Sequence, residues 1–420
     1  MSARHGLPTI RSSSLRHGTV ERAPSRCPTV LLLLAALALG GCTSEPELEF
    51  AEWTLPVAEE TRIVEYAGVP LGERDPGTVQ LIDDLVIGAD LTNPDAVLYQ
   101  ASDLAVADNG TIFVADIGSQ NIKVFGADAT HLATLGREGQ GPGEFAYVGS
   151  LTIAGELLLV RDVRNRRFSV WTLDGRHVAD HTPADSRGAS SVQGLADETL
   201  VWSVTERNED RSGERIVVRG TPEGEVLAEL FRQPIAAPVQ LSVNEPLLML
   251  QSMVDSLDDP RLVLHVGGRQ VVYLSALQEY QVLAMTPDGT AAWALRVAWP
   301  RLPLPEAQKQ SLIDSVLDNF PVETTVTVDQ LEWPERSPSI VGLSSDGAGR
   351  LYVFPTPEGL GLEPPESWPV DVYSPDGGHI ASGTVPYRWS YARGDYVYGT
   401  RPDDNDETVV VRYRLLVNGQ

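Results

Sequence analysis

Histidine is the residue type in this chain that could most directly bind a metal or carry out acid–base chemistry. His177 and His181 stand four residues apart, but they lie on a predicted strand and lack the acidic neighbour of a zinc-binding helix, so they do not predict a local zinc site. Most of the histidines after the N-terminal segment neighbour glycine or polar turn residues, and we expect them to be exposed: His131, His177, His181, His265 and His379. A metal site would need several of them to converge in space.

Aspartates at predicted turns are the second group that could do chemistry, either by binding calcium or by acid–base catalysis. The candidates are Asp103, Asp108, Asp116, Asp162 and Asp346. Aspartate side chains in turns usually accept hydrogen bonds from the nearby backbone. The sequence contains neither an EF-hand series of the DxDxDG type nor a GxSxG nucleophile elbow. These residues therefore predict structural caps, and no catalytic residue is assigned.

A glycine-rich run, Gly139-Gln140-Gly141-Pro142-Gly143-Glu144-Phe145, could be mistaken for a phosphate-binding loop. Such a loop needs backbone amides at the start of a helix, usually followed by Lys and Ser or Thr. Here Pro142 and Phe145 do not open a helix. The run predicts a tight connection between structural repeats.

The charge balance narrows the range of partners. The chain has 58 acidic and 32 basic residues, giving a net charge of −26. A nucleic-acid partner needs a basic surface and is not predicted. No cofactor is predicted, although the acidity leaves a divalent cation or a cationic partner open. The two cysteines, Cys27 and Cys42, both precede the folded part, which therefore has no thiol.

The N-terminus carries an export signal. Val30–Leu39 reads VLLLLAALAL, the length of a signal-peptide core and too short to span a bilayer. The following Leu39-Gly40-Gly41-Cys42 resembles a bacterial lipobox, which implies cleavage after residue 41 and lipidation of Cys42. By the same resemblance, Thr rather than Asp at position 43 implies the outer membrane over retention in the inner membrane, if the host has both. Residues 1–41 are thus predicted to be the signal peptide and 42–74 a tether.

Strand-and-turn repeats fill the rest of the chain. A turn of the form x-acidic-Gly recurs at 173–175, 222–224, 287–289 and 375–377, with a degenerate copy, Ala127-Asp128-Ala129. The acidic residues at 128, 174 and 223 lie 46 and 49 residues apart, the period of propeller blades. Each such turn joins the third and fourth predicted strands of a set. The longer later spacings require insertions, near 232–260 and 299–338.

Counting strands gives the fold class. Five sets of four strands lie between 101 and 385, and a sixth set has three strands before the C-terminus. The missing strand can come from 78–88, which closes the ring and leaves no open edge. We predict an all-β, six-bladed β-propeller over residues 75–420, built of four-stranded antiparallel blades. A single short helix is predicted in the second insertion, after Pro305 and before Phe320-Pro321.

The first repeat carries a family resemblance. The stretch Asp103–Phe145 resembles the NHL-like six-bladed β-propellers of bacterial exported proteins. The positions that carry this resemblance are Asp103, Val106, Gly110, Ile112, Val114, Asp116, Ile122, Val124, Phe125 and the run Gly139–Phe145. The resemblance implies the fold. It does not imply one activity, because relatives include binding scaffolds and enzymes, among them amidating lyases that bind metal through histidines of several blades.

Two functional hypotheses remain. The first is a lipid-anchored envelope propeller that binds a protein, peptide or glycan where loops converge at the mouth of the central channel. The alternative is a metal-dependent hydrolase or lyase, of the lactonase or amidating-lyase type, with its site on the propeller axis. The missing catalytic motifs favour the first hypothesis. The tryptophans of the later repeats fit either packing between blades or a ligand groove: Trp202, Trp293, Trp299, Trp333, Trp368 and Trp389. Ligand identity and oligomeric state are not predicted.

Lipidation of Cys42 is directly testable by metabolic labelling with an alkyne fatty acid in a bacterial host. Cys42→Ala should abolish labelling completely, because the cysteine sulfur is the acceptor. Cys27→Ala is the matched control and should be labelled as strongly as the wild type. Undiminished labelling of Cys42→Ala would show that the lipobox resemblance is accidental.

Overall fold

The computed structural model describes residues 50–419, which belong to one compact unit, Leu48–Gln420. Within that range it leaves out 89–91, 183–189, 209–211, 236–246, 248–249, 252–253, 255–261, 268–269, 277, 301, 318–324, 358–364 and 403–407. The predicted signal peptide and Cys42 lie outside the described residues.

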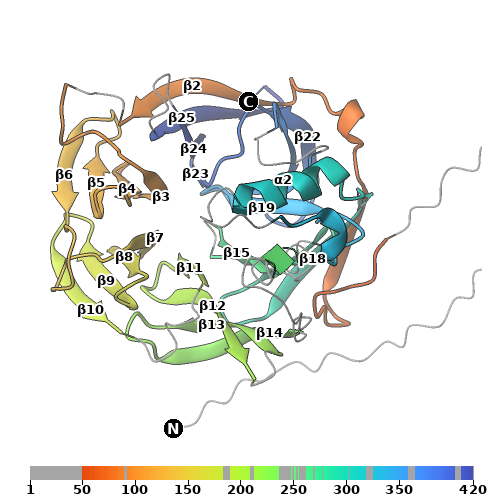
Figure 1. Ribbon diagram of the computed structural model, residues 1–420, viewed down its shortest axis with the longest axis horizontal. Helices are drawn as coiled ribbons and strands as arrows, with labels where there is room; N and C mark the ends of the chain where they lie inside the picture. The colour runs from red at the N-terminus through yellow and green to blue at the C-terminus, as the bar shows by residue number, and fades with distance from the viewer. Residues whose placement is uncertain are drawn as a thin grey trace, which may run out of the picture. The chain divides into compact units, whose positions relative to one another are not determined.

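Six sheets radiate around a central axis, as Figure 1 shows. Blade 1 consists of β3 (Ala101–Val106), β4 (Ile112–Asp116), β5 (Asn121–Phe125) and β6 (His131–Leu135). Blade 2 consists of β7 (Val148–Ala154), β8 (Leu157–Asp162), β9 (Arg167–Thr172) and β10 (His177–His181). Blade 3 consists of β11 (Ser190–Gly194), β12 (Leu200–Arg207), β13 (Gly213–Gly220) and β14 (Val226–Ile235). Blade 4 contains β15 (Leu262–Val266), β16 (Val272–Ala276), β17 (Gln281–Met285) and β18 (Ala291–Ala298). Blade 5 consists of β19 (Ile340–Ser345), β20 (Leu351–Pro355), β21 (Trp368–Tyr373) and β22 (His379–Val385). Blade 6 consists of β23 (Tyr391–Arg393), β24 (Tyr396–Pro402), β25 (Thr408–Val417) and β2 (Val79–Ile87).

The ring is closed by β2, the N-terminal strand of the sixth blade. It pairs antiparallel with β25 from Val79–Val417 to Ile87–Val410. Sequence reasoning placed this strand at 78–88, so the predicted six-bladed propeller and its closure are confirmed. Closure matters because an open joint would leave unpaired strand edges in water.

The recurrent turns lie between the third and fourth strands, as predicted. Gly175, Gly224, Gly289 and Gly377 have φ of 89°, 97°, 89° and 82°, a conformation that glycine adopts without strain. In the degenerate copy, Ala129 takes φ of 66°. The hairpin therefore requires a positive φ at this position, and glycine is the residue that meets this requirement without strain.

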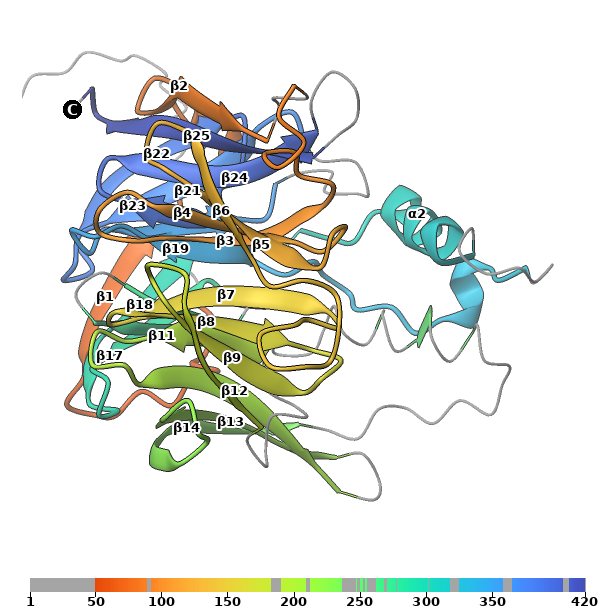
Figure 2. The same cartoon turned by 90° about the vertical axis from the view of Figure 1, so that its left-hand side faces the viewer.

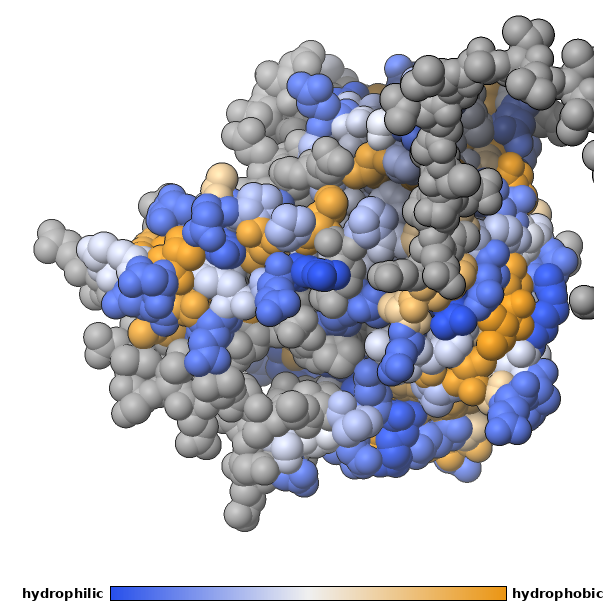
Figure 3. Space-filling view, turned by 90° about the vertical axis from the view of Figure 1, so that its right-hand side faces the viewer, coloured by the Kyte–Doolittle hydropathy of each residue, from blue (hydrophilic) through white to orange (hydrophobic). Residues whose placement is uncertain are grey.

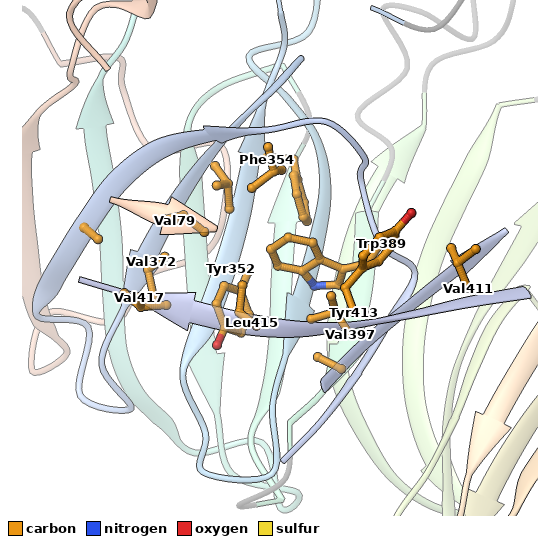
Figure 4. Packing of buried hydrophobic residues seen from close by; sticks show 14 of the residues in the cluster. Val79, Tyr352, Phe354, Val372, Trp389, Val397, Val411, Tyr413, Leu415 and Val417 are labelled. Atoms are coloured by element: carbon orange, nitrogen blue, oxygen red, sulfur yellow. The ribbon is translucent and has the colours of Figure 1, made fainter. Parts of the chain in front are cut away.

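Apolar cores fill the spaces between neighbouring blades. Figure 4 shows the core between blades 5 and 6, where the Trp389 ring meets Phe354 nearly edge-on, with ring centroids 4.8 Å apart and an interplanar angle of 80°. Val79 of the closing strand belongs to the same cluster. At the other end of β2, Ile87 packs into the core between blades 6 and 1. The closing strand therefore seals two interfaces between blades.

The two faces of the ring differ in their loops. Turns from each inner strand to the second strand, such as 108–110 and 155–156, lie on what we call the hairpin face. Connections between blades, such as 136–147, lie on the opposite, connector face, from which α2 (Glu306–Leu317) stands off in Figure 2. The helix confirms the prediction for the second insertion. No helix in the described part of the chain is long and apolar enough to cross a membrane.

The two insertions pack together. Leu250 and Val254 of the first insertion form a small core with Ile313 of α2, near the short helix η2 (Val328–Gln330). Trp333 covers this core and donates a hydrogen bond from Nε1 to the Val328 carbonyl, at 2.8 Å. Figure 3 shows the projecting part with hydrophobic residues among hydrophilic ones. The insertions thus form one accessory lobe; the remainder of the 232–260 insertion lies largely outside the described residues.

The prediction of a tether up to residue 74 is wrong for residues 50–74. β1 (Arg62–Ala67) adds a fifth, parallel strand to blade 4 beside β18. Leu55 is buried in the core between blades 3 and 4, and Gln281 binds both the Thr54 amide, at 2.9 Å, and the Glu52 carbonyl, at 2.6 Å. The pairing partner of β1 lies more than 200 residues away, so local sequence gave no signal for it.

Arg74 fixes the chain just before β2. Its side chain is fully buried and forms a bidentate ion pair with Asp371 of blade 5, with Nη1–Oδ1 and Nη2–Oδ2 distances of 2.8 and 3.1 Å. Asp371 also accepts hydrogen bonds from Tyr280 and Ser382, at 2.7 and 2.5 Å. The buried carboxylate is thus surrounded by donors, and the pair holds the closing strand's entry point against blade 5.

Arg74→Ala should lower the free energy of unfolding by about 3–5 kcal/mol, because it leaves the Asp371 carboxylate buried without its cation. Urea unfolding followed by circular dichroism measures this. The matched control is Arg176→Ala, whose ion pair with Asp174 is exposed and should contribute under about 1 kcal/mol. Equal losses in the two variants would contradict the structural role given to Arg74.

Candidate functional site

A cavity of about 1120 Å³ opens along the propeller axis and reaches the hairpin face. Residues of all six blades line it, because every inner strand ends there: β3, β7, β11, β15, β19 and β23. Its mouth is framed by exposed turn residues such as Asp108, Asn109 and Glu156. This is the place where sequence reasoning expected loops to converge.

Side-chain hydrogen bonds join neighbouring inner strands around this cavity. The acceptor or donor side chain comes from one blade and its partner from the next. The bonds are Asp103 Oδ2 to the Leu151 amide, 2.8 Å; Thr152 Oγ1 to the Gly194 amide, 2.7 Å; Gln270 Oε1 to the Ala196 amide, 2.7 Å; His265 Nε2 to Ser345 Oγ, 2.9 Å; and the Tyr391 hydroxyl to the Val106 carbonyl, 3.1 Å. Much of the polar lining therefore also holds the ring together.

Asp103 and His265 are the lining groups whose ionisation the channel alters most. Burial raises the pKa of Asp103 to about 6, although hydrogen bonds from the Leu151 and Leu104 amides partly oppose this. Burial lowers the pKa of His265 to about 4, so its ring is neutral at pH 7. Burial at these two positions thus disfavours the charged form of each side chain.

The other candidate aspartates have structural partners. Asp116 is fully buried and accepts the amides of Tyr99 and Gln100, at 3.2 and 2.8 Å. In the second blade, Asp162 does the same for Ala146 and Tyr147, at 3.2 and 3.1 Å. Each carboxylate holds the chain that enters the inner strand of its own blade, so the interpretation as backbone caps is confirmed for both.

Asp346 and Asp108 line the cavity but are paired with cations. Asp346 accepts hydrogen bonds from Arg350 Nε, at 2.5 Å, and from the Tyr352 hydroxyl, at 2.9 Å. Asp108 forms an ion pair with Arg393 at the mouth. Their charges are therefore partly compensated, which leaves Asp103 as the lining carboxylate held mainly by backbone amides.

The histidines do not converge. Four of them lie on outer strands: His131 on β6, His177 and His181 on β10, and His379 on β22. Only His379 is exposed and the others are half-buried, so the expectation that most would be exposed is wrong. Each contacts a nearby side chain: His177 is 3.1 Å from Asp180, for example, and His181 is 3.4 Å from Glu223 of blade 3.

The donor set on the axis does not fit a catalytic metal. Such a site needs about three protein ligands, and the channel brings together one histidine, His265, with carboxylates on separate strands. Among the residues that the structure describes, no group of three histidine, cysteine, aspartate or glutamate side chains could hold a metal ion. We therefore derive no metal-dependent step.

The glycine-rich run is a connector, as predicted. The Gly139 amide donates to the Phe145 carbonyl, at 3.0 Å, and the Gly141 amide donates to Glu144 Oε2, at 2.8 Å. The Phe145 ring is fully buried in the core between blades 1 and 2. These amides donate hydrogen bonds within the loop instead of pointing to a ligand, and the loop is followed by a strand, β7, and not by a helix.

The tryptophans of the later blades pack in the cores or against other side chains. Trp202, Trp293 and Trp389 are each at most 4% exposed. Trp299 lies under the Arg74 guanidinium, whose carbon is 5.2 Å from the ring centroid. The packing interpretation accounts for these positions.

Sequence reasoning did not place several residues on the channel wall: it left out Thr152, Ser345 and Tyr391, and it expected His265 to be exposed. In four blades a polar residue lies two or three positions before the glycine that ends or follows the inner strand. The pairs are Thr152 and Gly155, His265 and Gly267, Ser345 and Gly347, and Tyr391 and Gly394. A polar side chain at this point of an otherwise apolar strand is the signal that could have identified them.

Known families and structures agree on the fold. Residues 90–254, less than half of the chain, match the model of the DUF5128 family, described as a 6-bladed beta-propeller. No curated protein matches the sequence. The class that fold and channel define is a six-bladed β-propeller.

Solved structures similar to this chain are distant in sequence. A protein of Bacteroides fragilis described as exported is 10% identical, with a TM-score of 0.52 over 84% of this chain and 99% of its own. A DUF4221 family member of Bacteroides vulgatus is 11% identical, with a TM-score of 0.48 over 82% and 100%. Virginiamycin B lyase of Staphylococcus aureus is 9% identical, with a TM-score of 0.39 over 80% and 98%. At such identities the first likeness shows the fold alone, and the other two support no further argument.

His265 should make stability depend on pH. Its pKa falls from about 6.5 in the unfolded chain to about 4 in the fold, so the unfolded state binds more protons between these values. This contribution is complete above pH 6.5 and is lost as pH falls towards 4. Relative to His265→Gln, the wild type should lose up to about 3 kcal/mol between pH 7 and 4, measured by urea unfolding.

Two features sharpen this test. Asp103, with its raised pKa, contributes with the opposite sign between pH 4 and 6, but it is present in both proteins and cancels in the comparison. Ser345→Ala removes the hydrogen-bond partner and keeps the imidazole, so it should retain the wild-type pH dependence. A constant difference between wild type and His265→Gln across this range would refute the assignment.

Proposed function

We propose that this chain is an exported, non-enzymatic binding module that takes part of a protein, peptide or glycan into the mouth of its central channel. The observation that carries the proposal is the cavity of about 1120 Å³, framed by all six blades. Pockets for small molecules usually measure about 300–1,000 Å³. The cavity is therefore large enough for a peptide loop or the end of an oligosaccharide.

The lining favours a ligand rich in hydrogen-bond donors. Five carboxylate side chains line the cavity, against two arginines: Asp103, Asp108, Glu156, Asp174 and Asp346 against Arg176 and Arg393. Amide and hydroxyl side chains lie between them, including Asn109, Gln193 and Gln270. Hydroxyl groups of a glycan or amide and amine groups of a peptide suit these acceptors. A strongly anionic ligand does not suit them.

Export and anchoring complete the proposal. The lipobox resemblance at Leu39–Cys42 supports attachment to the bacterial envelope, with the outer membrane as the proposed destination. The chain has no cysteine after Cys42, which suits an oxidising compartment. The ligand would then be a component of the envelope or of the surrounding medium.

Blocking the mouth tests the channel directly. Ligands are first selected for the wild type on a glycan array and from a displayed peptide library, and the best of each is remeasured by calorimetry. Glu156→Trp places a bulky ring at the mouth and should weaken binding at least tenfold. Glu138→Trp, the same change at an exposed position on the connector face, should leave the dissociation constant within twofold.

The two variants also define failure. If Glu156→Trp binds every selected ligand as tightly as the wild type does, the channel is not the binding site. Loss of binding in both variants, with folding intact by circular dichroism, would place the site elsewhere or point to a global effect.

A further inference from the structure

A second, smaller pocket of about 220 Å³ lies between blades 5 and 6. It is formed by the starts of β21 and β25, the end of β24 and the connection from β22 to β23, which together place it on the connector face, away from the channel mouth. Its lining is Leu81, Pro365, Trp368, Pro386, Tyr387, Arg388, Trp389, Gly399, Thr400, Arg401, Val411 and Tyr413. The channel site uses none of these residues.

Aromatic rings form much of the wall. Tyr387 and Tyr413 stack with ring centroids 5.6 Å apart and an angle of 18° between their planes. Trp389 is held edge-on by Phe354 and Tyr352, at 4.8 and 5.3 Å between centroids. Trp389 and Tyr413 are buried, at 3% and 5% exposed, and support the wall from below, whereas Tyr387 is 40% exposed and offers a flat apolar surface to a ligand.

The charge of this pocket opposes that of the whole chain. Although the chain has 58 acidic residues, the described part of the lining contains two arginines and no aspartate or glutamate. Arg388 lies over the Trp368 ring at 5.5 Å, and among the described residues no carboxylate forms an ion pair with it. Arg401 forms a hydrogen bond with Tyr413. Two guanidinium groups beside aromatic planes favour a carboxylate, which they bind in a planar, bidentate way.

Trp389 supplies an independent sign of a missing partner. The residue is only 3% exposed, and its indole Nε1 has no hydrogen-bond partner among the described residues. Buried donors are nearly always satisfied, so each exception needs an explanation. Because Trp389 is one of the residues that line the pocket, an acceptor oxygen of a bound ligand is the explanation that also fits the arginines.

We infer that this pocket binds an acidic sugar, a single pyranose ring that bears a carboxylate. The volume of about 220 Å³ is below that of usual drug-sized pockets and suits one ring. An apolar face of the sugar would lie against the exposed Tyr387 ring, and its carboxylate would meet Arg388 and Arg401.

A peptide suits the pocket less well. Extended peptides are usually held by main-chain hydrogen bonds to a free strand edge. Here each bordering strand is paired on both sides. β21 lies between β20 and β22, β24 lies between β23 and β25, and β25 lies between β24 and β2. The bordering strands therefore have no free edge for a peptide backbone, whereas side chains suffice to bind a sugar ring.

Calorimetry on the full-length protein tests this with three probes. Methyl glucuronide should bind at least tenfold more tightly than methyl glucoside, which lacks the carboxylate, and its affinity should fall as sodium chloride rises from 50 to 500 mM. N-acetyl-tyrosine, a carboxylate on a peptide-like group, should bind more weakly than the glucuronide.

Variants assign the binding to the pocket. Arg388→Gln and Arg401→Gln should each weaken glucuronide binding at least fivefold, while Arg176→Gln, the same change at the channel mouth, should have no effect. Glu156→Trp should also leave it unchanged, so this inference and the channel proposal can fail separately. Equal affinity for glucoside and glucuronide, tighter binding of N-acetyl-tyrosine, or full binding by Arg388→Gln in a folded protein would overturn the inference.

Discussion

The pairing of β2 with β25 is the constraint on which the rest of this propeller depends. Each blade contacts only its two neighbours. If one joint of the ring is open, the two blades that border it each have one side uncovered. The closing strand contributes Val79 to the core on one side of blade 6 and Ile87 to the core on the other. Chain segments separated by more than 300 residues must therefore meet before either interface is shielded from water.

The same constraint shapes the channel. Neighbouring inner strands meet around the axis, where polar side chains bridge from one strand to the next. Asp103, His265 and Tyr391 serve the architecture in this way while also lining the cavity. Binding at the mouth can thus use groups that are already rigid, which lowers the entropic cost of recognition.

Sequence reasoning recovered what depends on local order and missed what depends on distant partners. Turn glycines, strand alternation and the count of strands were enough for six blades and for the closing strand. The strand Arg62–Ala67 and the buried Arg74 were missed, because their partners lie in blades 4 and 5 and nothing near them in the sequence indicates burial. For the channel, Asp103 was recognised as a cap, whereas the roles of His265 and Ser345 required their spatial pairing. The positive pocket between blades 5 and 6 likewise combines residues from separate repeats.

Residues 50–74 have a mechanical consequence. A pull on the N-terminal side of the propeller meets Leu55 and β1 first, then the Arg74–Asp371 pair, and only afterwards the closing strand. These contacts act in series, so load is dissipated on blades 4 and 5 before it reaches the joint that keeps the ring shut. Residues 50–74 therefore bear a pulling force before the closing strand does, and the ring can stay closed while the N-terminal end of the propeller is under tension.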